Sequence, residues 1–421
     1  MPSSIINRHN RDHHGFYTVG EFKTYSKHEA IEVGVRIGKP VQWNYNRDVF
    51  EKVNWTVEPL GSLELYYRQR AMQLREKYDY LVLFYSGGSD SHNMLMSFVN
   101  NNIFVDEIVQ YHQLEAYNGD KTYVSNLEQF ATSIPITQHL IETNPTYKNT
   151  VHRLIDLTSF KKQVLSDRAI KDDWWHIHND FFGMNATAMS NIKYIDPAYR
   201  QIGDSGKHVC FVWGVDKPYL KVDDTNNWTC SFYDTSFGSI VSVESKLKNE
   251  TWSSEELFYW TPDFPEMVVK QSHVIKNFVE KFADNQADNK HVARGIVDRN
   301  EYGLYDDMIN VPAFTFTKHN QSYTMMTDGV RRLLYPCWQP ESVVRPVLKS
   351  FLFADSDQAY LTDNAPDLAG RNHYVKGAFR LREYMRKHAH QYWYEYKHDP
   401  KVGPFYGGIK SMTNSYSLQR K

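Results

Sequence analysis

The sequence predicts an α/β fold, a doubly wound parallel sheet that carries α-rich or mixed extensions at both ends of the chain. Three observations predict it. An apolar run at residues 80–85 ends on a glycine turn, a second apolar run at 208–213 also ends on a glycine, and strand-like and helix-like segments alternate between the two. Such alternation is typical of parallel sheets, in which ligands bind beyond the carboxyl ends of the strands.

The central elements follow from the spacing of apolar residues. Residues 80–85 are apolar on both faces, as in the central strand of a parallel sheet, and apolar residues recur at helical spacing after the glycine turn. We therefore expect a helix at about 63–78, a strand at 80–85 and a helix that ends near residue 100.

The segments that follow continue the alternation. We expect, in chain order, a strand at 105–114, a helix at 123–134, a strand at 137–143, helices at 151–165 and about 174–191, and a strand at 208–214. Beyond this sheet, the turn at 261–265 precedes a helix that runs to about residue 282.

The chain divides into three predicted regions. Residues 1–62 are expected to form an N-terminal mixed extension, with a strand at 30–37. Residues 63–285 are expected to form the main domain, and residues 286–421 a C-terminal mixed, partly helical region. We find no internal repeat and no low-complexity linker between them.

Composition indicates a globular protein of the cytoplasm. Of the 421 residues, 41% are hydrophobic and 23% charged, and no stretch approaches the roughly 18 apolar residues of a membrane span. The first residues have no apolar core, so we expect no secretory signal. Cys210, Cys230 and Cys337 lie far apart, which favours reduced thiols over a disulfide framework or a cysteine zinc site.

The turn after the first strand has the composition of an anion site and reads Ser86, Gly87, Gly88, Ser89, Asp90 and Ser91. A helix N-terminus offers backbone N–H groups, and glycines let an anion approach them closely. Neither GxxxxGK[ST] nor GxGxxG occurs, which excludes the two commonest phosphate loops. In its strand–turn–helix context the segment resembles the SGGxDS signature of the PP-loop ATP pyrophosphatases. That family includes the synthetase domain of asparagine synthetase, the NAD and GMP synthetases and several tRNA-modifying enzymes, and the resemblance covers about residues 75–220.

The resemblance implies a HUP-like fold, of the adenine nucleotide alpha hydrolase type, with ATP and Mg²⁺ as its ligands. It also implies that Asp90 binds magnesium and takes part in catalysis. A lone loop carboxylate suits magnesium, which is held by one or two carboxylates plus phosphate oxygens. The phosphates that leave as pyrophosphate would be held by Ser86, Gly87, Gly88, Ser89 and Ser91.

Two further parts of a nucleotide site are implied by the same resemblance. The family's adenine pocket uses backbone near the ends of the first two strands, here Leu83, Phe84, Gln110 and Tyr111. The turn after the fourth strand, residues 214–217, is similar to the glycine–acid turn of asparagine synthetase-like members. It implies a nucleotide contact at Gly214, a second magnesium at Asp216 and a catalytic, charge-neutralising role for Lys217.

Departures from known members narrow the expected function. The first cysteine is Cys210, so we expect no glutaminase domain with an N-terminal cysteine nucleophile, and paired cysteines of the thiolating members do not occur. The chain therefore resembles a ligase that adenylates an acceptor oxygen, releases pyrophosphate and admits ammonia or an amine. It would be asparagine synthetase-like without a glutaminase. Two alternatives stay open: a catalytically silent ATP- or AMP-binding module, and a tRNA- or nucleobase-modifying PP-loop enzyme.

Two other interpretations are less favoured. A GxSxG nucleophile elbow, typical of α/β-hydrolases, fails because Ser91 stands where the last glycine relieves crowding. Residues 371–401 carry eight Lys/Arg against three Asp/Glu, interleaved with aromatics as on an RNA-contacting surface. Such a stretch is more often a solvated helix with an aromatic packing face, and the net charge of -2 attracts no polyanion. The expected partners are ATP and an acceptor of unidentified class.

Overall fold

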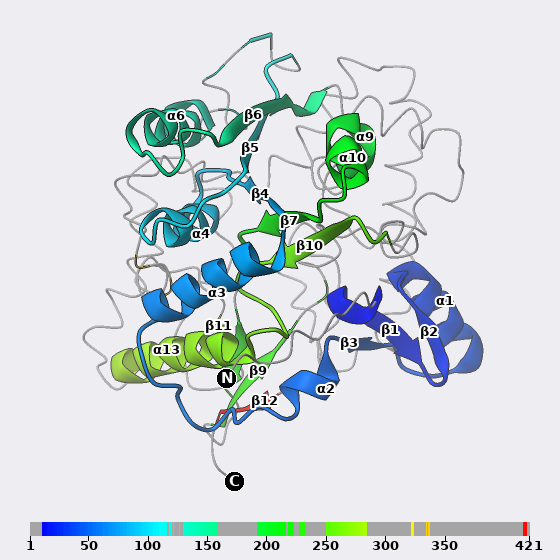
Figure 1. Ribbon diagram of the computed structural model, residues 1–421. Helices are drawn as coiled ribbons and strands as arrows, with labels where there is room; N and C mark the ends of the chain where they lie inside the picture. Colours follow the sequence, from blue (N-terminus) through cyan, green and yellow to red (C-terminus); the bar gives the residue numbers. More distant parts are fainter. Residues whose placement is uncertain are drawn as a thin grey trace.

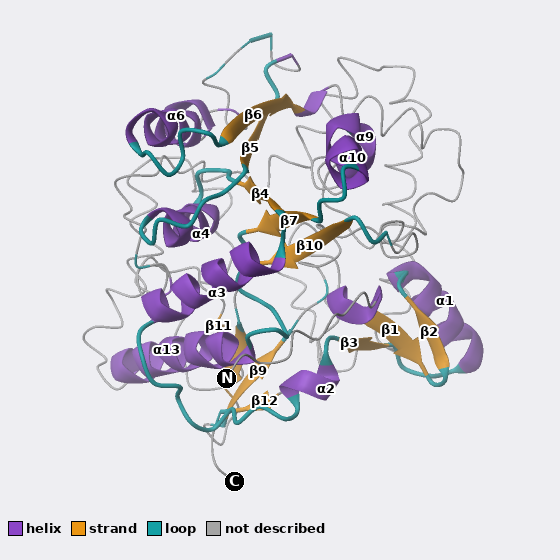
Figure 2. Cartoon of the chain, in the orientation of Figure 1, coloured by secondary structure: helices purple, strands orange, loops and turns teal. Residues whose placement is uncertain are grey.

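The computed structural model describes residues 11–115, 129–158, 192–215, 218–222, 227–232, 250–283, 321–323 and 416–418, with single residues at 118, 119, 121, 126, 234, 334 and 336. Figure 1 shows their arrangement along the chain, and Figure 2 distinguishes helices from strands.

The centre of the fold is a five-stranded sheet with the strand order β10-β7-β4-β5-β6. Every neighbouring pair in it is parallel. The chain enters at the middle strand, builds outward to β6, and returns to the other side of the middle strand. This order is compatible with the doubly wound sheet that the sequence predicts. Its strands are β4 (Tyr80–Phe84), β5 (Glu107–His112), β6 (Val151–Asp156), β7 (Val209–Trp213) and β10 (Ser253–Leu257).

Helices flank the parallel sheet on both sides (Figure 1). α4 (Ser89–Val99) and α6 (Ile134–Thr143) lie on one side, and α9 (Ile192–Ile195) and α10 (Pro197–Asp204) lie on the other. Side chains of β5 alternate between the two layers. Gln110 Nε2 donates to Thr137 Oγ1 of α6 at 2.6 Å, whereas Glu107 Oε1 accepts from Tyr199 Oη of α10 at 2.7 Å.

The elements predicted around the glycine turn are confirmed. The helix expected at 63–78 is α3 (Leu63–Lys77), which packs beside α4, and the two apolar runs are the neighbouring strands β4 and β7. Leu81, Val82 and Leu83 have no exposed surface, as expected of a strand covered on both faces.

The strand predicted at 30–37 is wrong, because these residues belong to helix α1 (Lys27–Ile37). The β-branched residues favoured a strand, but the capping residues decide the outcome. Ser26 Oγ accepts from the Glu29 backbone N–H at 3.3 Å, the N-terminal signature Ser-x-x-Glu. Gly38 ends the helix in the left-handed conformation at φ +66°.

Two adjacent elements exchange type relative to the prediction. Residues 137–143, expected as a strand, belong to α6, where Ile134, Thr137 and Leu140 are buried at intervals of three residues. The helix expected from residue 151 begins instead with strand β6, and residues 159–165 lie outside the described residues. β6 is the edge strand, and its Val151 and Leu154 are exposed. Its sequence therefore does not show the alternation of apolar and polar residues by which a strand is recognised. Of the helix expected at 123–134, the described part includes the π-helical turn η3 (Gln129–Ser133).

The sequence analysis assigns no strand to β10, whose residues read SSEEL. Both of its glutamates are buried and point to opposite sides of the sheet. Glu255 Oε1 lies 2.5 Å from Lys193 Nζ of α9, and Glu256 Oε2 lies 2.9 Å from Arg70 Nη2 of α3. Because two charged residues stand where apolar residues are usual, the sequence pattern does not indicate a strand here.

The remaining elements form two antiparallel sheets and three helical segments. Residues 11–50 contribute η1 (Arg11–His14), β1 (Phe16–Val19), β2 (Phe22–Thr24), β3 (Gln42–Asn44) and α2 (Arg47–Phe50), with the sheet order β2-β1-β3. The second sheet, β11-β8-β9-β12, pairs strands far apart in sequence: β8 (Tyr219–Val222), β9 (Trp228–Ser231), β11 (Gln321–Tyr323) and β12 (Tyr416–Ser417). The helix predicted after residue 265 is confirmed as α13 (Pro265–Ala283).

Aromatic side chains join the N-terminal elements to this second sheet. The Phe50 and Phe232 rings lie 4.5 Å apart between centroids, and the Trp55 and Tyr416 rings stack at 4.8 Å. Trp260, just beyond β10, packs edge-on against Phe232 at 5.2 Å. Buried aromatic pairs of this geometry add to the area that they remove from water.

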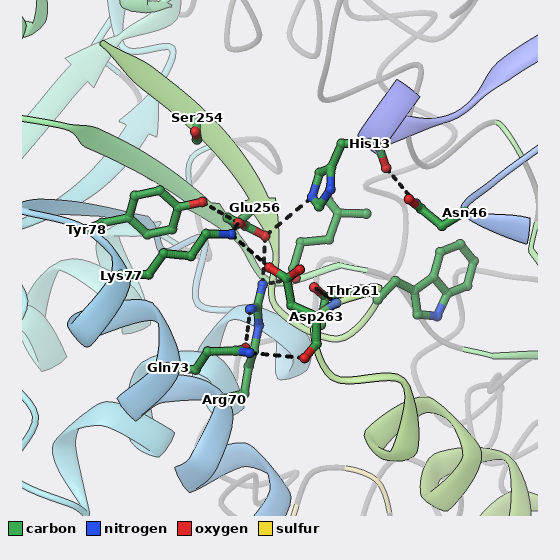
Figure 3. Close-up of polar contacts among 12 residues, drawn as sticks. His13, Asn46, Arg70, Gln73, Lys77, Tyr78, Ser254, Glu256, Thr261 and Asp263 are labelled. Atoms are coloured by element: carbon green, nitrogen blue, oxygen red, sulfur yellow. Dashed lines mark hydrogen bonds and ion pairs between the residues drawn. The ribbon is translucent and has the colours of Figure 1, made fainter. Parts of the chain in front are cut away.

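A cluster of buried charges centred on Glu256 joins α3, β10 and η1 (Figure 3). The carboxylate accepts from Arg70 Nη2 at 2.9 Å, from Lys77 Nζ at 2.9 Å and from the Tyr78 hydroxyl, and His13 Nε2 lies 3.7 Å away. Burial opposes ionisation of Glu256, but the Lys77 and Arg70 cations, together with the nearby His13, outweigh it and hold its pKa well below the ordinary value. Asp263 is a second carboxylate partner of Lys77, whose Nζ also donates to it at 2.8 Å.

We predict that Glu256→Gln lowers the free energy of unfolding by about 3 kcal/mol, because it leaves the buried Arg70 cation without its counter-ion. Urea unfolding followed by circular dichroism measures the change. Glu51→Gln is the matched control, since the Glu51–Arg47 pair on α2 is exposed, and its effect should be small. An equal loss in the two variants would contradict the central role of Glu256.

The same carboxylate predicts a loss of stability in acid. Because folding depresses the pKa of Glu256 below 4.5, its contribution is complete above that value and disappears as the pH falls through the lower folded-state value. The difference in unfolding free energy between wild type and Glu256→Gln should therefore shrink as the pH is lowered below about 4. A difference that stays constant down to the acid limit would exclude this linkage.

Candidate functional site at the carboxyl edge of the sheet

The predicted anion loop lies where the strand order of the sheet reverses. β4 ends at Phe84 and α4 begins at Ser89, so the intervening residues cross the carboxyl edge between β7 and β5. In open α/β sheets this switch point is where ligands bind. The strand–turn–helix context predicted for the loop is therefore confirmed, together with its place on the sheet.

The two glycines of the loop have different backbone requirements. Gly87 has φ +87°, a conformation that side-chain-bearing residues rarely adopt. Gly88 precedes α4 with φ −69° and ψ 161°, an ordinary extended conformation, and has no side chain to cap the helix. The N–H groups of the first turn have no partner within the helix itself, so this end of α4 is suited to an external acceptor.

Ser91 holds the loop together from inside. Its Oγ accepts from the Ser86 backbone N–H at 3.2 Å, lies 3.1 Å from Ser86 Oγ and donates to the Gly88 carbonyl at 3.2 Å. Ser86 Oγ in turn accepts from the Gly88 N–H at 3.3 Å. These bonds explain why small hydroxyl residues flank the glycines: their side chains fix the loop backbone.

Gly214, at the end of β7, packs directly on the loop. A Cβ atom placed on it would lie 2.8 Å from Ser91 Cα, 3.0 Å from Ser91 N and 3.1 Å from the Asp90 carbonyl oxygen. All three are backbone atoms, which cannot rotate away as a side chain can. The two glycine turns that the sequence analysis singled out are therefore in contact.

Asp90 lies in the first turn of α4, partly exposed, where a negative charge is favoured by the helix dipole. Its carbonyl oxygen accepts from Tyr259 Oη at 2.7 Å, and Tyr259 Oη also accepts from Asn93 Nδ2 at 3.0 Å. Tyr259, in the segment after β10, thus holds the first turn of α4 in place. In the part of the chain that the structure describes, no group of three or more His, Cys, Asp or Glu side chains is arranged to hold a metal ion.

A tyrosine–histidine pair supports the loop and was not found from the sequence. Tyr85, which follows β4, and His92, in the second turn of α4, are both buried, and Tyr85 Oη lies 2.9 Å from His92 Nδ1. Burial lowers the pKa of His92, so its imidazole is neutral and Nδ1 can accept from the tyrosine. The signal available in the sequence was their placement on both sides of the glycines.

The four residues predicted to line an adenine pocket lie in two adjacent strands. Leu83 and Phe84 are in β4, and Gln110 and Tyr111 are in β5. The Gln110 side chain is fully buried and committed, because Nε2 donates to the Ser133 carbonyl and to Thr137 Oγ1 while Oε1 lies 2.8 Å from His152 Nε2. Only the backbone of Gln110 could therefore meet a ligand.

Two aromatic side chains stack on each other at the ends of β4 and β7. The Phe84 and Trp213 rings lie 3.8 Å apart between centroids with an interplanar angle of 10°. They are register partners on β4 and β7, so their side chains emerge on the same face. Sequence analysis predicted a role for Phe84 but none for Trp213. The remaining predicted residues, Asp216 and Lys217, lie outside the described residues.

None of the protein-family models, curated proteins and solved structures compared with this chain matches it. The site is thus defined by its own geometry: a glycine-capped helix N-terminus, a loop with an αL glycine, an adjacent carboxylate and a second glycine turn. Among the described residues, no helix has the length and apolar character needed to cross a membrane. Chemically, the arrangement can bind an anion at α4 and a cation at Asp90.

We predict that Gly214→Ala lowers the free energy of unfolding by about 1–3 kcal/mol, because its methyl group would displace the backbone of α4. Hydrogen exchange should show weaker protection of the amides at the start of α4. Gly38→Ala is the control: it puts a side chain into open space and costs about 1 kcal/mol through its left-handed conformation alone. Unchanged exchange at α4 in Gly214→Ala would contradict the close approach.

Proposed function

We propose that this protein is a magnesium-dependent ATP pyrophosphatase of the PP-loop type, with a HUP-like nucleotide-binding sheet. It transfers the adenylyl group of ATP to an acceptor oxygen, releases pyrophosphate, and passes the activated acceptor to ammonia or an amine. The observation that carries the proposal is the SGGSDS loop at the N-terminus of α4, next to Gly214 at the switch point of a parallel sheet.

The loop suits the two terminal phosphates of ATP. Backbone N–H groups at a helix start bind phosphate oxygens, and the dipole of α4 favours their charge. Gly88 has no side chain where the phosphates would approach, Gly214 lets β7 pack against the loop backbone, and Ser91 fixes the loop conformation before ATP binds. Such preorganisation supports binding and leaves the α-phosphorus open to an attacking oxygen.

Asp90 fits a magnesium ion that is bound mainly by phosphate. Magnesium usually takes one or two carboxylates plus phosphate oxygens and water, so a single carboxylate beside the phosphate loop is sufficient. Asp90 would hold this ion, and Asp216 would hold a second magnesium ion. When bound, the ion neutralises charge on the departing pyrophosphate.

The chain's own groups account for the remaining requirements of the reaction. The N–H groups of the first turn of α4 would orient the β- and γ-phosphates, and the backbone of β4 and β5 would place the adenine ring near Phe84 and Tyr111. Lys217 would neutralise charge that develops on the transferred phosphoryl group. The acceptor oxygen then forms a bond to the α-phosphorus as the bond to the bridging oxygen breaks.

The products of ATP labelled at the α-phosphate test the proposal. Incubation with magnesium and a mixture of small metabolites should yield AMP and pyrophosphate. Asp90→Asn should lower the rate by about 100-fold or more, because the magnesium ion bound to the phosphates would lose its carboxylate ligand. Asp48→Asn, an exposed aspartate in the first turn of α2, is the matched control and should retain the wild-type rate. ADP and phosphate as the sole products would refute adenylation.

A second variant tests the loop by sterics alone. Gly88 has an ordinary extended backbone, so Gly88→Val should fold with little strain while its side chain occupies the space of a phosphate. We expect ATP affinity, measured by calorimetry, to fall by about 100-fold or more, a loss of roughly 3 kcal/mol. Wild-type affinity in this variant would exclude a phosphate loop. Tight ATP binding by the wild type without any cleavage would instead favour a silent nucleotide-binding module.

A further inference from the structure

A histidine–aspartate pair lies at the same edge of the sheet as the loop. His112 is the last residue of β5 and Asp156 the last of β6, and they are register partners. His112 Nδ1 lies 3.5 Å from Asp156 Oδ2. Their side chains keep 13% and 25% of their surfaces exposed, so both are accessible from the carboxyl edge.

Asp156 is held in place as a carboxylate. Its Oδ2 accepts from the Glu115 backbone N–H at 3.0 Å, and its Oδ1 accepts from the Thr158 N–H at 2.9 Å. Burial opposes its ionisation, but the hydrogen bonds from His112, Thr158 and Glu115 outweigh it and hold the pKa of Asp156 below its usual range. A fixed anion beside an imidazole stabilises the imidazolium that forms when the histidine takes a proton.

The His112 side chain lies on the face of the sheet that carries α4 and its loop. Gln110, two residues earlier on β5, reaches α6 on that face, and side chains two apart share a face. The Phe130 ring of η3 lies 5.5 Å from the His112 ring, on the same side. Since Val109 pairs with Phe84, His112 ends β5 one strand away from the loop and level with it.

The two ring nitrogens of His112 differ in their surroundings. Nδ1 lies 3.5 Å from Asp156 Oδ2 and 3.3 Å from the Leu114 backbone nitrogen. In the tautomer that acts as a base, the proton is on Nδ1 and is directed at Asp156, which leaves the lone pair on Nε2. Within the described residues, Nε2 has no hydrogen-bond partner, so it is the nitrogen open to a ligand. Two other histidines of this sheet face are committed: His92 to Tyr85, and His152 to Gln110.

We propose that His112, oriented by Asp156, is the general base that takes a proton from the attacking nucleophile in this site. The inference rests on the proposed function, which supplies ATP at the neighbouring loop. With water as the nucleophile, its oxygen bonds to the α-phosphorus, its proton passes to Nε2, and the electron pair of the broken bond leaves with pyrophosphate. With ammonia or an amine, the same nitrogen takes the proton as the new bond to carbon forms and AMP leaves.

The charged groups around the ring are few within the described residues. Asp156 faces it from β6, and exposed Glu115 lies in the turn that follows β5. Lys121 Nζ lies 5.2 Å from the centroid of the Phe130 ring, which in turn packs against His112. α4 presents Asp90 and the loop at the same edge. The carboxylate of Asp156 is therefore the group most directly placed to influence proton transfer at His112.

Formation of AMP from α-labelled ATP and magnesium tests the proposal, with enzyme in excess so that a slow first turnover with water is measured. His112→Gln should lower the rate by about 100-fold and flatten its dependence on pH, because the variant has no imidazole to take the proton. Asp156→Asn should lower it in the same direction but less. His139→Gln, an exposed histidine on α6, is the matched control and should retain the wild-type rate.

Two further measurements separate a chemical role from a structural one. ATP affinity of His112→Gln should remain within about 2-fold of wild type, and imidazole added to His112→Ala should restore AMP formation. A wild-type rate and pH profile in His112→Gln, or the absence of rescue, would overturn the role of His112 while leaving the proposed function intact. No AMP from the wild type would overturn both.

Discussion

A single buried carboxylate, Glu256, joins the parts of the structure that build the site. It ties the edge strand β10 to α3 through Arg70 and Lys77. β10 holds β7 in place along five register pairs, and β7 delivers Gly214 to the backbone of the loop. Tyr259, just beyond β10, donates to the Asp90 carbonyl from the other direction. Loss of the Glu256 contacts would therefore loosen both supports of the first turn of α4.

The two polar regions of the molecule differ in the surroundings of their charged groups. Around Glu256, two cations face two carboxylates, and the groups bond to one another around the buried Arg70–Glu256 pair. Such a cluster is stable only when it is complete, so it is suited to holding elements together and unsuited to binding a charged ligand. At the carboxyl edge, by contrast, Asp90 and His112 are both partly exposed. This contrast is the reason for assigning function to the edge and structure to the buried cluster.

The proposed reaction would use the ends of four neighbouring strands. The loop after β4 would bind the phosphates, the turn after β7 would close over it, and the pair at the ends of β5 and β6 would accept the proton. Parallel strands bring these groups together because all their carboxyl ends meet at one edge. The opposite face of the same sheet is occupied by a structural network, in which Glu107 bonds to Arg153 and Tyr199 and fixes α10. The two faces can have these different roles because successive side chains of β5 point to opposite faces of the sheet.

The sequence by itself determined the local features that short-range chemistry controls. The glycine turn, the strand before it and the helices on either side followed from apolar spacing and from the conformational freedom of Gly87. The tertiary structure decided everything that depends on partners distant in the chain. The sequence pattern of β10 does not resemble a strand because Glu255 and Glu256 find their cations on α9 and α3. The edge strand β6 lacks a strand-like apolar pattern, because its Val151 and Leu154 stay exposed while Ile155 is buried. The contact between Gly214 and Ser91 and the pairing of His112 with Asp156 arise from strand order, which no local pattern encodes.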